Sequence, residues 1–206
     1  FIDAFLRGED IHTRTAAQIF DIPVDKVTAR QRDDAKAVNF GIVYGISDYG
    51  LARNINVSRN KAKSYIDNYF ARYPKVLEYM NNTIESARED GYVSTLLGRR
   101  RYLPELKSRN YNIRSFGERV AMNMPIQGTA ADIIKMAMNN VHYALKEAGF
   151  KSKLILQVHD ELIVDTYIPE LDEVKKIVRE QMENAIELKI PLIVDIGTGY
   201  SWFDAN

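Results

Sequence analysis

Apolar residues recur at helical spacing through most of the chain. Ser58 is placed as the N-cap of a helix that runs toward Tyr73, and Pro74 then interrupts and restarts the pattern. The second helix keeps its spacing until Gly91. Residues 91–104 are turn-prone and basic, which predicts a loop or a short ribbon.

Two further capping patterns follow. Ser115 and Thr129 each stand three residues before an acid, so we expect helices to begin near both. Pro125 lies between them and should bend the path of the chain, because it cannot donate to the helical hydrogen-bond ladder.

The C-terminal part has the pattern of a small sheet. Residues 153–158 and 161–165 are two strand-like apolar runs, an amphipathic helix is predicted over 171–185, and a last strand over 192–196. Helices segregated from a small antiparallel sheet indicate a predominantly helical α+β fold.

Composition narrows the classes of function. The chain has 206 residues, 46% of them hydrophobic and none of them cysteine, which excludes a disulfide framework, a thiolate zinc site and a cysteine nucleophile. No apolar run reaches the length of a membrane helix, and the N-terminus has no basic leader. There is no initiator Met, so we expect a processed chain or a piece of a longer one.

The net charge of zero hides two opposed segments. Residues 98–119 hold seven basic and two acidic side chains, a net charge of +5, whereas residues 160–195 carry −6. The first could hold a polyanion and the second cations; two solvated faces are the alternative.

Arg32, Lys36, Phe40 and Tyr44 recur every four residues and therefore share one face of a helix. Two cations near a helix start suit a phosphate chain, and the aromatic rings beyond them suit a stacked base. Gly45 would allow a hinge at the end of the row. The alternative is a surface helix whose aromatic end packs on the core.

His159, Asp160 and Glu161 stand between the two strand-like runs. Adjacent carboxylates on a rigid turn can bind Mg²⁺, although acids at turns are commonly only solvated. Asp160 and Glu161 would point to opposite faces of a regular strand, so a two-ion site needs another carboxylate from elsewhere.

Three motifs follow one another along the chain: Arg32-x3-Lys36-x3-Phe40-x3-Tyr44-Gly45, Arg119-x3-Asn123-x-Pro125-x-Gln127-Gly128, and Gln157-Val158-His159-Asp160-Glu161. In this order they resemble bacterial family A DNA polymerases of the DNA polymerase I type. The similarity extends over essentially the whole chain, including residues 10–13 and 98–102.

The resemblance implies roles for the residues that match. His12, Arg32 and Lys36 would contact the phosphates of an incoming deoxynucleoside triphosphate, Lys36 also neutralising or protonating the leaving group. Phe40 would pack on the sugar and base, and Tyr44 would occupy the template-base stacking position. A second set would touch the primer–template minor groove: Arg119, Asn123, Gln127 and His159. Asp160 resembles an invariant metal-binding aspartate with Glu161 beside it, in a mechanism that uses two Mg²⁺ ions.

The resemblance also implies an architecture. Residues 1–114 would be the fingers and residues 115–206 the C-terminal part of the palm of a right-hand polymerase. The thumb, any nuclease domain and the motif that carries the other metal-binding aspartate are absent from the sequence. We therefore expect template-directed DNA synthesis in the parent enzyme, with roles in replication and repair, and no activity in the isolated chain.

The expected partners are primer–template DNA and deoxynucleoside triphosphates, with no membrane. We expect a monomer in the cytoplasm, associated with the nucleoid. Two alternatives remain at this point: a non-catalytic nucleotide or primer–template binding module, and a single-subunit RNA polymerase with similar motifs.

Overall fold

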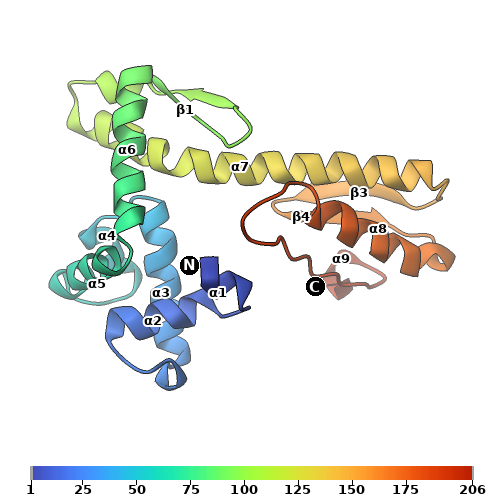
Figure 1. Ribbon diagram of the computed structural model, residues 1–206, viewed down its shortest axis with the longest axis horizontal. Helices are drawn as coiled ribbons and strands as arrows, with labels where there is room; N and C mark the ends of the chain where they lie inside the picture. Colours follow the sequence, from blue (N-terminus) through green and yellow to red (C-terminus); the bar gives the residue numbers. More distant parts are fainter. Residues whose placement is uncertain (1, 206) are drawn as a thin grey trace. The chain divides into compact units, whose positions relative to one another are not determined.

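The computed structural model describes residues 2–205, which form two compact units (Figure 1). One unit extends to Gly128 and the other begins at Thr129; each is described by itself. The predicted boundary between fingers and palm, at 114/115, concerns subdomains of the family and stays a prediction.

The first unit is built mainly from helices, joined by a two-stranded ribbon. Its elements are α1 (Ile2–Leu6), α2 (Ile11–Phe20), α3 (Ala29–Val43), α4 (Asp48–Asn54), α5 (Arg59–Arg72), α6 (Pro74–Asp90), β1 (Tyr92–Ser94) and β2 (Arg100–Tyr102), with 3-10 turns at Val24–Lys26 and Pro104–Lys107. A long helix, α7 (Tyr111–Glu147), begins in this unit and ends in the other.

The second unit combines the end of α7 with a hairpin and a helix. Its further elements are β3 (Lys153–Val158), β4 (Glu161–Asp165), a 3-10 turn at Ile168–Glu170, α8 (Leu171–Glu183) and α9 (Trp202–Ala205). The α+β fold, mostly helical with two small antiparallel sheets, is confirmed. Among residues 2–205, no helix is both long and apolar enough to cross a membrane.

The local signals at α5 and α6 work as predicted. Ser58 caps α5, its hydroxyl accepting the N–H of Lys61 at 3.3 Å. Pro74 occupies the first position of α6, where its missing N–H costs nothing, and Gly91 ends that helix with a φ of +80°. The basic segment that follows forms the β1–β2 ribbon.

The prediction of separate helices that begin near Ser115 and Thr129 is wrong, because α7 is continuous through both positions. The helix is capped earlier, since the side chain of Asn110 accepts the N–H of Asn112 at 2.9 Å. Ser115 lies inside the helix, and its hydroxyl accepts a hydrogen bond from the side chain of Arg119 instead.

The structure also shows no division into two helices at Pro125, where we expected the path of the chain to bend. Pro125 lies within α7, where the lost hydrogen bond and the ring clash cost about 3 kcal/mol. Ala121 is fully buried one turn before it, and Met124 packs against the same apolar cluster. We attribute the continuity of the helix to this packing, together with the helical hydrogen bonds on both sides.

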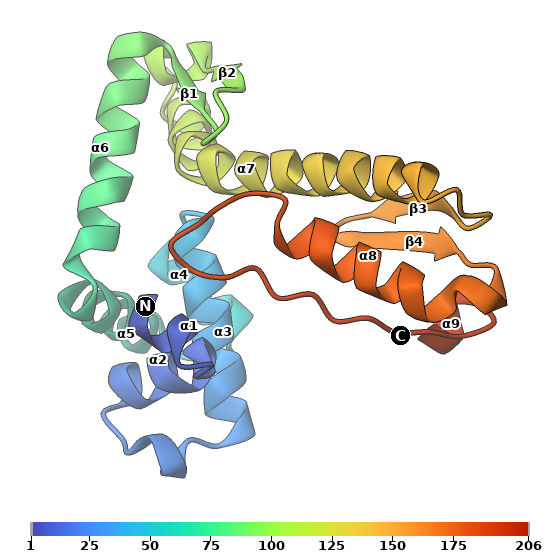
Figure 2. The ribbon, with the colours of Figure 1, turned by 45° about the vertical axis from the view of Figure 1, so that its right-hand side comes forward.

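The core of the first unit lies between α2, α3, α4 and α5. Val38 and Leu51 are fully buried there, and α2 lies beside α3 in both views (Figures 1 and 2). The core of the second unit joins Val141 of α7 and Val174 of α8 with Leu162 of β4. The β3–β4 hairpin runs alongside α8 and the C-terminal part of α7 (Figure 2).

The strand predicted over 192–196 is wrong: these residues are irregular. Half-buried and exposed residues alternate through the segment as in a strand, but the part of the chain that the structure describes offers it no pairing partner. The N–H of Val194 is bound by the carboxylate of Glu183 at 3.1 Å instead of by a strand.

Candidate functional site

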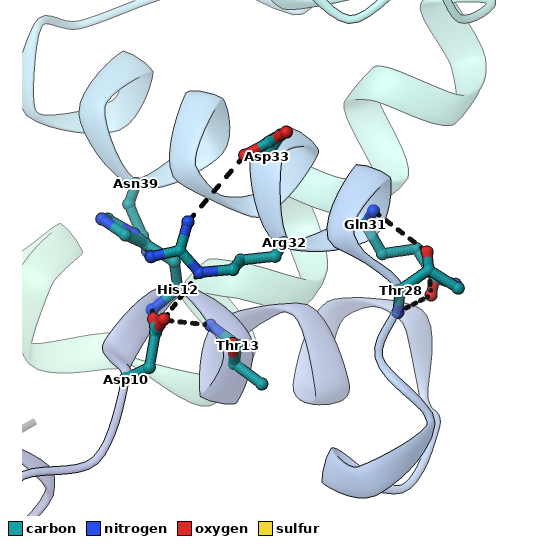
Figure 3. A network of polar contacts seen from close by, with 8 residues as sticks. All are labelled: Asp10, His12, Thr13, Thr28, Gln31, Arg32, Asp33 and Asn39. Carbon is teal, nitrogen blue, oxygen red and sulfur yellow. Dashed lines mark hydrogen bonds and ion pairs between the residues drawn. The ribbon is translucent and has the colours of Figure 1, made fainter.

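The start of α2 is fixed by the carboxylate of Asp10. One of its oxygens accepts the N–H groups of His12 at 2.8 Å and Thr13 at 3.1 Å, which makes Asp10 the N-cap (Figure 3). His12 therefore occupies the first turn of the helix.

The start of α3 is fixed by a reciprocal capping box between Thr28 and Gln31 (Figure 3). Arg32 follows in the next position, and its Nε donates to the second oxygen of Asp10 at 2.6 Å. This ion pair joins the beginnings of α2 and α3. Both side chains remain 40% exposed, so an incoming ligand can reach them.

The charges around this contact perturb two ionisable groups. Burial acts to raise the pKa of Asp10, but the hydrogen bonds from Arg32 and from the N–H groups of Thr13 and His12 outweigh it and lower that pKa. Burial also lowers the pKa of His12, and the positive charges of Arg32 and Lys36 lower it further. The negative charge of Asp10 acts to raise the pKa of His12 but does not outweigh them. Asp10 is therefore held ionised, while His12 favours its neutral form.

The predicted cation–aromatic row follows α3. Lys36 is exposed, and Phe40 is 48% exposed with its ring centroid 5.7 Å from that of His12. The helix ends at Val43, and Tyr44 is the C-cap residue, so three of the four predicted side chains lie within the helix and the fourth lies at its end. Two cations, an imidazole and exposed rings are thus present along α2 and α3.

A hollow of about 530 Å³ opens beside Phe40 and Tyr44. Gly45 stands at its edge with a φ of +67°, and a Cβ there would lie 2.5 Å from Met122 Cε and 3.0 Å from Arg119 Cγ. Glycine therefore lets α7 approach the end of α3. The hollow is lined by Ala37, Phe40, Gly41, Tyr44, Gly45, Ile46, Ser47, Asn54 and Arg119.

The second motif forms a row on α7, with Arg119, Asn123 and Gln127 spaced by four residues. Nε2 of Gln127 donates to the hydroxyl of Tyr44 at 2.6 Å, and Arg119 donates to Ser115 at 2.9 Å. Nδ2 of Asn123 is buried and makes no hydrogen bond to any residue that the structure describes. The row is thus connected to the aromatic end of α3.

The third motif forms the two-residue turn between β3 and β4. His159 takes a left-handed φ of +51°, which hairpin turns require and which histidine adopts more readily than most residues. The carbonyl of His159 accepts Nε2 of Gln157 at 2.6 Å. The turn therefore projects His159 and Asp160 from the tip of the hairpin.

The two candidate metal ligands differ in their surroundings. Asp160 is exposed and makes no side-chain hydrogen bond or ion pair within residues 2–205, whereas Glu161 accepts the indole N–H of Trp202 at 3.2 Å. No group of three or more acids or histidines that could hold a metal lies within the described residues. The hard oxygens of Asp160 and Glu161 suit Mg²⁺, but they supply only part of a coordination shell.

The predicted site residues thus fall into three groups. The first is His12 with Arg32, Lys36 and Phe40; the second is Tyr44 with Arg119 and Gln127; the third is His159 with Asp160 and Glu161. The first two groups belong to the first unit and the third to the second.

Sequence reasoning missed three residues that contact these groups: Asp10, Asn39 and Trp202. Asp10 could have been predicted, because an acid directly before a helix is a common N-cap residue. Asn39 could have been predicted too, as a polar residue on the buried face of α3. Nothing local to Trp202 points to Glu161.

A family model for DNA polymerase family A matches residues 1–204 of the chain. The chain belongs to DNA polymerase family A. It is 54% identical over 205 residues to the DNA polymerase I of Caldicellulosiruptor bescii and 55% identical over 206 residues to that of Lactococcus lactis subsp. lactis. Each alignment covers 100% of this chain and 24% of the relative, so the chain spans about a quarter of the length of these curated family A proteins.

A solved family A structure has nearly the same fold. It is described as the POL domain of Pol1 from M. smegmatis in complex with DNA primer-template and dNTP. The match has a TM-score of 0.94 with 48% identity, and it covers 99% of this chain and 36% of that one. The resemblance drawn from the three sequence motifs is confirmed.

Proposed function

We propose that the chain is the nucleotide-binding and metal-binding section of a template-directed DNA polymerase. The parent enzyme transfers a nucleotidyl group from a deoxynucleoside triphosphate to a primer 3′-hydroxyl. The observation that carries this proposal is the convergence of His12, Arg32, Lys36 and Phe40 on one edge of the α2–α3 pair. The similar Pol1 structure, described as a complex with primer-template and dNTP, supports it.

His12, Arg32 and Lys36 bind the triphosphate. All three donate hydrogen bonds, and the two cations also offset its negative charge. Lys36 lies nearer the aromatic end of α3 and neutralises or protonates the leaving pyrophosphate. Phe40 offers an exposed ring to the sugar and base, and Tyr44 takes the template-base stacking position beside the hollow.

Arg119, Asn123, Gln127 and His159 contact the minor groove of the primer–template. Each can donate to the N3 and O2 acceptors that every base pair presents there, so these contacts check pair geometry without reading sequence. Nδ2 of Asn123 is buried without a partner among the described residues, so a rotation of the side chain that exposes it would supply a donor for such an acceptor. The hydrogen bond from Gln127 to Tyr44 connects the groove residues with the stacking position.

Asp160 and Glu161 would hold Mg²⁺ at the tip of the β3–β4 hairpin, in an enzyme that uses two ions. A bound cation would lower the pKa of the primer hydroxyl and stabilise the charge on the leaving phosphate. Asp160 is the stronger ligand candidate, because its carboxylate is exposed and has no partner in the described part of the chain. Another carboxylate must complete the site.

Residues 1–114 serve as fingers and residues 115–206 as part of the palm, and we propose that the chain is inactive alone. A monomeric, cytoplasmic protein stays a prediction.

The competing function is a non-catalytic module that binds nucleotide or primer–template, which the lack of a third metal-ligating side chain among the described residues favours. It predicts primer–template binding without extension at any Mg²⁺ concentration, even when the chain is part of the full-length protein.

The test uses the full-length polymerase that contains this chain, with Asp160→Ala compared with Asp165→Ala. Both variants remove one exposed carboxylate from the same hairpin, at its tip and at the opposite end of β4. Loss of a metal ligand worth a few kcal/mol should slow primer extension by about 100-fold or more for Asp160→Ala alone, with DNA binding retained. Equal extension by both variants would refute the role of Asp160. Absence of extension in the unmodified protein would favour the binding module.

A further inference from the structure

Asn39 is a polar residue in the apolar face of α3. It is 8% exposed, and Val38 and Ile42, which are apolar residues of the same helix, are buried on either side of it along the chain. Burying a carboxamide is costly unless its groups are hydrogen-bonded. Its Nδ2 lies 3.0 Å from Nδ1 of His12; both residues are drawn in Figure 3. The same Nδ2 lies 3.2 Å from the hydroxyl of Thr15, which is fully buried on α2.

The chemistry of the carboxamide fixes the direction of both contacts. Nδ2 carries two N–H donors and no acceptor, so Thr15 Oγ1 and His12 Nδ1 both accept. The amide oxygen makes no hydrogen bond to the described residues. Turning the amide over would leave two buried donors unpaired instead of one acceptor, which is the more costly arrangement.

A neutral imidazole carries its proton on one nitrogen only. Since Nδ1 of His12 accepts from Asn39, the proton must reside on Nε2. The ring is only partly buried and lies beside the exposed ring of Phe40, at the edge of α3 that also presents Arg32. The hydrogen-bond donor of His12 is therefore Nε2, the ring nitrogen that Asn39 does not contact.

We propose that Asn39 is a positioning residue: it holds His12 in the Nε2–H tautomer, with that N–H available to a triphosphate oxygen. The inference rests on the proposed function for its ligand, but the tautomer itself is a property of the protein without nucleotide. Thr15 supports the arrangement by holding the second N–H of the amide, so that the carboxamide cannot rotate without losing a buried hydrogen bond.

The charges that face His12 are those of Asp10, Arg32 and Lys36. Burial and the two cations lower the pKa of His12 and so keep the ring neutral, while Asp10 opposes them. An imidazolium would carry a proton on Nδ1 as well, and this proton would face the N–H group of Asn39. The contact thus tolerates the neutral ring and disfavours the charged one.

Histidine nitrogen NMR tests the tautomer directly. The 206-residue chain, labelled with ¹⁵N-histidine, contains three histidines, which limits the assignment to His12, His142 and His159. We expect His12 to show the shifts of an Nε2–H tautomer near neutral pH. Asn39→Ala should lose that preference. Asn39→Asp should reverse it, because a carboxylate accepts from Nδ1–H, and should also raise the pKa of His12.

Asn68→Ala is the matched control. Asn68 on α5 donates to the carbonyl of Ile19 on α2 at 3.3 Å, so the control removes an amide contact to the same helix without touching the ring. It should leave the spectrum of His12 unchanged. An Nδ1–H tautomer in the unmodified chain would overturn the proposal, and so would an equal response of His12 to Asn39→Ala and Asn68→Ala.

Single-nucleotide incorporation by the full-length polymerase separates the tautomer from its use. Asn39→Ala should raise the KM for the nucleotide by roughly 3- to 10-fold, with kcat changed less, because one neutral hydrogen bond is weakened. Asn68→Ala should leave both constants unchanged. If the tautomer changes as expected while the KM stays constant, the nucleotide role of His12 is wrong, whereas the positioning of its ring by Asn39 stands.

Discussion

Gly45→Ala tests the close approach of α3 and α7. Gly45 has a φ of +67°, where an alanine costs about 1–2 kcal/mol relative to its preferred conformations. The smaller entropy of the unfolded alanine chain returns about 0.4–1 kcal/mol. The added Cβ would also lie 2.5 Å from Met122 Cε, the far end of a flexible side chain, and 3.0 Å from Arg119 Cγ. Forcing these side chains off their rotamers costs about 0.5–1.5 kcal/mol.

Gly8→Ala separates the backbone cost from the collision. Gly8 has nearly the same φ, +65°, and a Cβ there would meet no atom within 4 Å. We expect Gly8→Ala to lower the free energy of unfolding by about 1 kcal/mol and Gly45→Ala by about 2 kcal/mol, measured from urea denaturation at a constant m value. Equal losses for the two variants would refute the placement of α7 against Gly45.

Three further predictions concern single side chains. Trp202→Phe keeps an aromatic ring but removes the indole N–H that Glu161 accepts. Titration of the full-length polymerase with Mn²⁺ should then show a metal affinity weakened several-fold. An unchanged affinity would exclude this contact as a support for the metal site. Phe40→Tyr adds a hydroxyl to an exposed ring that we propose packs on the sugar, where this hydroxyl could substitute for a missing 3′-hydroxyl. Dideoxynucleotide incorporation should therefore rise, and an unaltered ratio to deoxynucleotides would contradict the proposed position of Phe40. Desolvation acts to raise the pKa of Glu170, but hydrogen bonds from the N–H groups of Lys151 and Ser152 and from the Ser152 hydroxyl outweigh it and lower that pKa. The stability that Glu170 provides is therefore present above its unfolded pKa near 4.5 and is lost as the pH falls through the lower folded value. Glu170→Gln should flatten the decline of thermal stability at acid pH, and an unchanged decline would contradict this reasoning.

Local chemistry predicted the parts of the fold that depend on neighbouring residues. Ser58, Pro74 and Gly91 delimit α5 and α6 as expected, because caps and breakers act within one turn of the chain. The same rules wrongly divided residues 111–147 into separate helices, because burial of the apolar residues around Pro125 outweighs the cost of the proline. They also failed over 192–196, where the alternation is present but a strand requires a partner.

The candidate site likewise has residues that the sequence predicts and contacts that it does not. Four-residue spacing found Arg32, Lys36 and Phe40, because the periodicity of a single helix brings them to one edge. The contacts that orient the site join distant residues: Asp10 and Arg32 are 22 positions apart, and His12 and Asn39 are 27 apart. Only the packing of α2 against α3 makes such pairs.

The central proposal is that the α2–α3 edge binds the triphosphate of a deoxynucleotide and that Asp160 binds a metal ion. A crystal structure of the full-length polymerase with primer–template, a non-hydrolysable deoxynucleotide analogue and Mg²⁺ measures this directly. We expect the triphosphate within hydrogen-bonding distance of His12 Nε2, Arg32 and Lys36, and Asp160 as a ligand of a Mg²⁺ ion. Phosphates bound away from these donors, or a cation site without Asp160, would contradict the claim.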